Sequence, residues 1–74
     1  MIRLMKNRKE ILNELLDEVK ENLIRIEITT GYLQKRHAES GKEAILHELA
    51  KLETNKQENS DWQKYLEEQV SNEK

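Results

Sequence analysis

The sequence predicts an all-α fold: an antiparallel helical hairpin that assembles into a dimeric helical bundle. The 74-residue chain has no proline, only two glycines and 38% charged residues, a composition typical of long exposed helices. Apolar residues recur at alternating steps of four and three, which is the repeat of a helix that packs along one other helix. A Ser40-Gly41 pair midway along the chain offers a point where its direction can reverse.

The first helix is expected over residues 8–39. Asn7 is a suitable N-cap, and Glu10 stands at the position that completes a capping box. The seam, meaning the apolar stripe that faces the second helix, consists of Leu12, Leu16, Val19, Leu23, Ile26, Thr30, Leu33 and His37. Gly31 follows β-branched residues and weakens helix propensity there. Because the seam keeps its phase past Gly31, we expect one continuous helix.

The return arm is expected as two helices, residues 42–54 and 61–70. Ile45, Leu46, Leu49 and Leu52 form the first apolar stripe, whereas residues 55–60 contain nothing apolar. The later stripe, with Trp62 and Leu66, points about 120° away from the first, which favours an interruption at 55–60. A single unbroken helix is the alternative.

The whole chain, residues 1–74, is expected to form one small domain with frayed ends at 1–6 and 71–74. A hairpin of this length buries little apolar surface, so association of two hairpins would supply stability that one lacks.

A second apolar line on the first helix predicts a binding surface. Ile24, Ile28 and Tyr32 follow one another at steps of four and point away from the seam. Leu23 lies where the polar segment 55–60 leaves the first helix least covered. The candidate partner-binding residues are Leu23, Ile24, Ile28, Tyr32, Trp62 and Tyr65.

The charge distribution gives an alternative function. Residues 1–42 carry nine Lys/Arg against seven Asp/Glu, and residues 43–74 carry four against eight, which leaves +2 and −4. The basic excess includes possible phosphate contacts at Arg3, Lys6, Arg8 and Lys9. A dimeric hairpin that binds RNA or DNA would be similar in shape to the plasmid repressor-of-primer protein.

No arrangement of residues in the sequence indicates catalysis or a cofactor. Neither His37 nor His47 is followed by a second ligand four residues later, and the chain has no cysteine. The segment Leu46-His47-Glu48-Leu49-Ala50 resembles the Ser-Gln-Glu-Leu-Asp motif of small sporulation-type phosphatases only at Glu48 and Leu49. Alanine stands where that motif ends in aspartate.

We therefore expect a non-enzymatic interaction protein, such as a regulator, inhibitor or adaptor. It would bind itself and a larger protein through an apolar helix face. With no cysteine, no expected signal peptide and no membrane span, a cytoplasmic location is expected. The abundance of Lys, Glu, Asn and Ile is typical of accessory proteins of low-GC bacteria and their phages.

Overall fold

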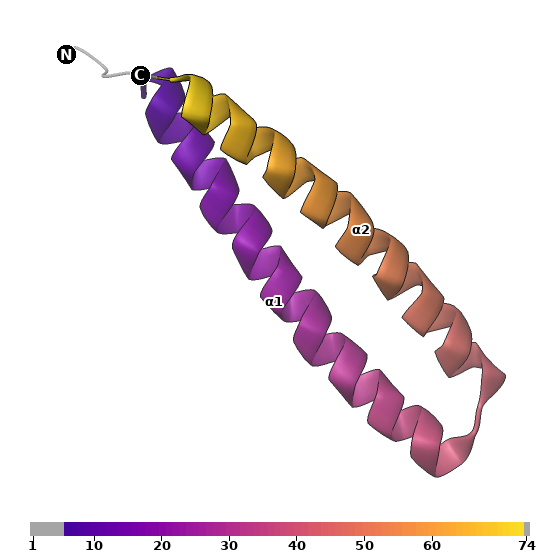
Figure 1. Ribbon diagram of the computed structural model, residues 1–74. Helices are drawn as coiled ribbons and strands as arrows, with labels where there is room; N and C mark the ends of the chain where they lie inside the picture. Colours follow the sequence, from indigo (N-terminus) through magenta and orange to yellow (C-terminus); the bar gives the residue numbers. More distant parts are fainter. Residues whose placement is uncertain (1–5, 74) are drawn as a thin grey trace.

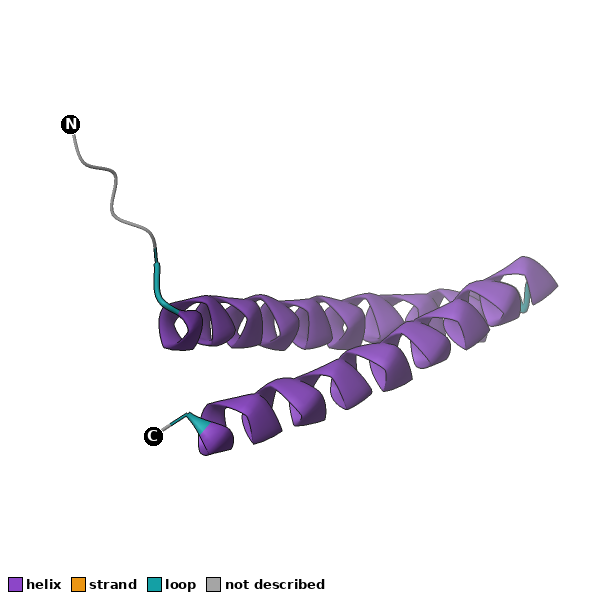
Figure 2. Ribbon diagram, turned by 90° about the horizontal axis from the view of Figure 1, so that it is seen from above, coloured by secondary structure: helices purple, strands orange, loops and turns teal. Residues whose placement is uncertain are grey.

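A computed structural model describes residues 6–73 as two long helices joined by a tight turn. Helix α1 (Arg8–Ser40) and helix α2 (Glu43–Asn72) run antiparallel, so that the start of α1 and the end of α2 lie at one end of the hairpin and the turn at the other (Figure 1). Seen from above, the two helix axes lie at an angle to each other (Figure 2). The predicted all-α hairpin is confirmed.

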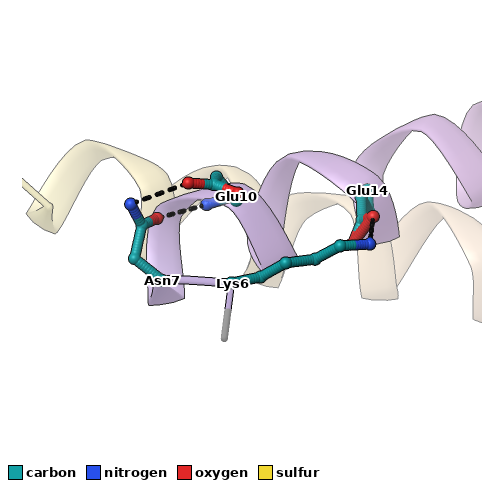
Figure 3. A network of polar contacts seen from close by, with 4 residues as sticks. All are labelled: Lys6, Asn7, Glu10 and Glu14. Carbon is teal, nitrogen blue, oxygen red and sulfur yellow. Dashed lines mark hydrogen bonds and ion pairs between the residues drawn. The ribbon is translucent and has the colours of Figure 1, made fainter. Parts of the chain in front are cut away.

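The start of α1 is fixed by the predicted cap. The Asn7 side-chain oxygen accepts a hydrogen bond from the Glu10 backbone N–H at 2.9 Å. In return, the Asn7 amide donates to the Glu10 carboxylate at 3.0 Å (Figure 3). These two bonds satisfy one of the free backbone donors at the helix start and place a carboxylate in the first turn, where the helix dipole favours it.

The turn depends on Gly41. Its φ of 66° lies in the left-handed region, which costs a side-chain-bearing residue extra energy. In this conformation its backbone N–H donates to the carbonyl of His37 at 2.7 Å and closes the end of α1. The Ser40 hydroxyl donates to the carbonyl of Arg36 at the end of the same helix.

The expected interruption at residues 55–60 is wrong, because α2 is one helix that also extends past 70 to Asn72. The predicted angle of about 120° between the two apolar stripes treats Trp62 as a core residue, whereas its side chain is 43% exposed. Leu52 and Leu66 instead share the seam. They lie fourteen residues apart, so the drift over two heptads is about 40°, which a left-handed supercoil absorbs.

Polar residues occupy the seam of α2 between these two leucines, at Lys56, Asn59 and Gln63. They continue the four-three spacing from Leu52 to Leu66 without breaking the helix. Asn59 and Gln63 are partly buried, and Lys56 is exposed.

All eight predicted seam residues of α1 are buried or partly buried. The main core lies near the chain ends, where Leu12, Leu16 and Val19 of α1 pack with Leu66 of α2. At that end Arg8 donates to the Gln69 side chain at 2.8 Å and lies 3.6 Å from the Glu73 carboxylate. These contacts fix how the two helices are aligned. Leu12 lies opposite Val70, and each following seam residue of α1 then lies opposite the preceding seam residue of α2.

The hairpin is long and thin. Its extents are 56 × 30 × 14 Å and its radius of gyration is 17.3 Å, whereas a compact domain of this length would have about 11 Å. Within the described part of the chain, neither helix carries an apolar stretch of the length needed to cross a membrane.

Candidate functional site

A cleft opens between the helices halfway along the hairpin. It has a volume of about 580 Å³, which is within the range of small-ligand sites. Residues from α1 form most of its wall, and α2 contributes three polar side chains. The lining residues are Leu23, Ile24, Ile26, Glu27, Thr30, Gly31, Gln34, Glu53, Lys56 and Ser60.

The cleft follows from a mismatch between the two seams. The register set near the chain ends places Asn59 opposite Leu23 and Lys56 opposite Ile26. A lysine side chain keeps its ammonium group in water and does not fill an apolar layer. Leu23 and Ile26 are therefore only partly buried, in contrast to the well-packed layers near the chain ends.

The outward face of α1 carries the second apolar line that the sequence predicts. Ile24, Ile28 and Tyr32 are 56%, 67% and 56% exposed. Arg36 lies over the Tyr32 ring at 5.9 Å from its centroid and donates a hydrogen bond of 3.1 Å to its hydroxyl. This hydrogen bond raises the pKa of Arg36 above its ordinary value. Tyr32 is thus held in one orientation on an otherwise open face.

Trp62 and Tyr65 form a separate aromatic pair on α2. Their rings stack with centroids 5.8 Å apart and an interplanar angle of 11°. Neither residue lines the cleft. In the register that places Leu12 opposite Val70, the pair comes level with residues 17–20 of α1, in the half of the hairpin that holds the core.

The structure therefore distributes the six predicted partner-binding residues over three places. Leu23 lines the cleft. Ile24 stands at the edge of the cleft and continues the line of Ile28 and Tyr32 on the outward face, whereas Trp62 and Tyr65 stack elsewhere. Tyr32 and the aromatic pair are about 22 Å apart along the hairpin, from a rise of 1.5 Å per residue. They do not form one surface.

The possible phosphate contacts at the N-terminus are partly engaged by carboxylates. Lys6 forms an ion pair with Glu14 (Figure 3), and Arg8 lies beside Glu73. The hydrogen bond from Lys6 to Glu14, followed by the attraction of that carboxylate, raises the pKa of the lysine. Lys9 is exposed. Arg3 lies outside the described residues.

Among residues 6–73, no group of three or more histidine or acidic side chains is placed to hold a metal ion. His37 lies partly buried on the seam and His47 is exposed on α2.

The sequence predicts that the polar segment 55–60 leaves Leu23 uncovered, and Lys56 and Ser60 of that segment line the cleft, whereas Glu27, Gln34 and Glu53 were not predicted. With an unbroken second helix, seam spacing continued from Leu52 also places Lys56 and Asn59 opposite the first helix. Polar residues opposite leucine and isoleucine predict a poorly filled layer.

Comparisons of the chain with protein-family models, with curated proteins and with solved structures found no match. The function proposed below is therefore based on the geometry of the hairpin.

Proposed function

We propose that this protein is a non-enzymatic interaction module, a regulator, inhibitor or adaptor that works as a homodimer and binds a larger protein through the outward face of α1. The observation that carries the proposal is the distribution of apolar side chains. Seven large hydrophobic side chains of the described residues are exposed, whereas only five hydrophobic side chains are buried. Three of the exposed side chains, Ile24, Ile28 and Tyr32, are aligned on one face of α1, and an exposed apolar line of this kind offers a surface to a partner.

The outward face suits recognition of a helix by a groove. Ile24, Ile28 and Tyr32 recur once per turn, so they would enter an apolar groove of the partner as consecutive anchors. Tyrosine and arginine are enriched among residues that dominate binding energy, and Tyr32 and Arg36 are already held together here. Little side-chain entropy would then be lost on binding.

The alternative of RNA or DNA binding has less support. A phosphate contact by Lys6 or Arg8 would have to replace an existing carboxylate neighbour. Helix α2 brings further acidic residues alongside, and the chain has a net charge of −2. We also place the protein in the cytoplasm of a low-GC bacterium or its phage, on the sequence grounds given above.

A pull-down from the native host tests the proposal with one variant and one matched control. Ile28→Glu puts a charge into the middle of the outward face of α1. Thr54→Glu adds the same charge at an exposed position of α2, outside the cleft. We expect a larger protein to be retained by the wild type and by Thr54→Glu but lost with Ile28→Glu. Equal retention by all three proteins would refute the assignment of this face.

A further inference from the structure

The aromatic pair Trp62–Tyr65 is an apolar surface that the hairpin does not use for its own core. The two side chains are 43% and 51% exposed, and their rings stack 5.8 Å apart at 11° to each other. Each ring holds the other in place, so little side-chain entropy would be lost when a partner binds. Tryptophan and tyrosine are also enriched among the residues that dominate binding energy. The pair is therefore suited to contact with another molecule.

The side chains around the aromatic pair are acidic. Glu58 and Asp61 lie one helical turn before the two rings, and Glu68 lies one turn after Tyr65. All three carboxylates are exposed. Among residues 6–73, no basic side chain forms an ion pair with any of them, and Asp61 accepts one hydrogen bond from Gln57. The two rings are thus framed by carboxylates that no cation of the hairpin neutralises.

These carboxylates belong to a larger acidic region. Residues 10–21 of α1 carry five Asp/Glu and one lysine, and residues 58–68 of α2 carry four Asp/Glu and one lysine. The two segments together have a charge of −7, whereas the whole chain has −2. Two of their nine acids are engaged, Glu14 by Lys6 and Glu21 by Arg25. A region of one sign attracts and orients a partner of the opposite charge, so the charge around the pair selects a basic partner.

Arginine is the basic side chain that fits both features of this surface. Its planar guanidinium stacks on aromatic faces and binds carboxylates through two parallel hydrogen bonds, whereas the lysine ammonium is a compact point charge. The hairpin makes the stacking contact within itself, where Arg36 lies 5.9 Å from the centroid of the Tyr32 ring. An arginine on the aromatic pair would make the same contact with carboxylates one helical turn away.

We propose that Trp62 and Tyr65, together with Glu58 and Asp61, form a docking site for an arginine-rich basic segment of a partner protein. The site lies on α2, in the half of the hairpin that holds the core, and is separate from the outward face of α1. It goes beyond the proposed function, because it gives the interaction module a second surface with a defined chemistry.

Synthetic octa-arginine and octa-lysine peptides test the site, because they carry equal charge and differ in stacking. Calorimetric titration in about 0.15 M salt, where attraction beyond about 8 Å is screened, measures both affinities. Octa-arginine should bind about two- to fivefold more tightly, which is the factor that an exposed cation–π contact supplies. Because Trp62 is the only tryptophan of the chain, a change in its fluorescence shows whether the arginine peptide reaches the pair.

The double variant Trp62→Leu/Tyr65→Leu isolates the stacking contribution. It keeps apolar side chains at two exposed positions and leaves every charge in place. Circular dichroism should show an unchanged helix content. The preference for octa-arginine over octa-lysine should disappear, while both peptides are still attracted by the acidic region.

A pair of double variants isolates the contribution of the local carboxylates. Glu58→Gln/Asp61→Asn should weaken octa-arginine binding about tenfold, since it removes the two ion pairs beside the rings. Glu43→Gln/Glu53→Gln is the matched control, because it removes two exposed carboxylates of the same helix outside the acidic region. It should weaken binding about twofold or less.

Four results would overturn the docking site: no binding of octa-arginine, equal affinity for the two peptides, binding without a change in Trp62 fluorescence, or an equal loss in the two carboxylate variants. The pull-down with Ile28→Glu is independent of all four, because it probes the outward face of α1. Failure of the peptide experiment together with capture of a larger protein through that face would leave the proposed function standing and remove only the site for a basic segment.

Discussion

Truncation of one leucine tests whether the hairpin is held together mainly at the end that carries its termini. The Leu66 side chain is 1% exposed and packs with Leu12, Leu16 and Val19. Leu66→Ala removes this contact and leaves a cavity, which costs about 2–5 kcal/mol. At about 0.05–0.15 kcal/mol per residue, the whole hairpin has only about 4–11 kcal/mol of stability. The variant should therefore lose roughly half of the free energy of unfolding.

Leu46→Ala provides the matched comparison, since it makes the same chemical change on the same helix. Leu46 is 47% exposed, so the change removes only part of a burial worth about 1.5–3 kcal/mol and opens no cavity. Its cost should be about 1 kcal/mol or less. The effect on helix propensity is the same at both positions and cancels.

Urea unfolding followed by circular dichroism at low protein concentration measures both variants, with a common slope if each unfolds in two states. Equal costs for Leu66→Ala and Leu46→Ala would refute the assignment of the core to the terminal end.

Three further variants test local features. Asn7→Ala should cost about 1 kcal/mol in the same assay, because the Glu10 N–H loses its cap. Asn59→Leu should raise the free energy of unfolding by about 1 kcal/mol, because a partly buried amide opposite Leu23 is replaced by an apolar side chain; no gain would contradict the register. Lys6 should titrate above its ordinary pKa of 10.5. Since the folded-state pKa is the raised one, the Lys6–Glu14 attraction is complete below pH 10.5 and is lost as the pH rises through the folded-state value. In the Glu14→Gln variant, the pKa of Lys6, followed by NMR, should return toward its ordinary value.

The first helix could be predicted from sequence almost completely. Its eight seam residues, the Asn7 cap and the Gly41 end are local features, fixed by spacing and by the conformational needs of single residues. Gly31 was also read correctly as an interior residue, because the seam spacing on either side of it stays in phase.

The second helix was predicted less well, because hydrophobicity was taken as a guide to burial. Trp62 is the largest apolar residue of the chain, yet it stacks on Tyr65 at the surface. Lys56 stands on the seam although it is charged. The continuous four-three spacing from Leu52 to Leu66 predicts better than hydrophobicity which residues of α2 face α1. Helix geometry fixes the direction of each side chain, whatever its chemical type.

The candidate site could be predicted only in part, because the cleft depends on the alignment of the two helices and not on one helix alone. Ile24, Ile28 and Tyr32 share a face by their spacing alone, and their exposure agrees with that expectation. The cleft depends on which residues of α2 stand opposite Leu23 and Ile26. That register is set far away, by the contacts of Arg8 and by the packing around Leu66.

The polar segment of the α2 seam connects the stability of the hairpin to its register. Apolar residues in place of Lys56 and Asn59 would fill the layers opposite Ile26 and Leu23 and would close the cleft. The same substitutions would make the seam uniformly apolar and would permit register shifts, which polar seam residues oppose at some cost in stability. The polar residues of α2 thus keep the register of a middle section that its own packing holds only weakly. Asn59→Leu should therefore make the hairpin more stable and its register less strictly fixed.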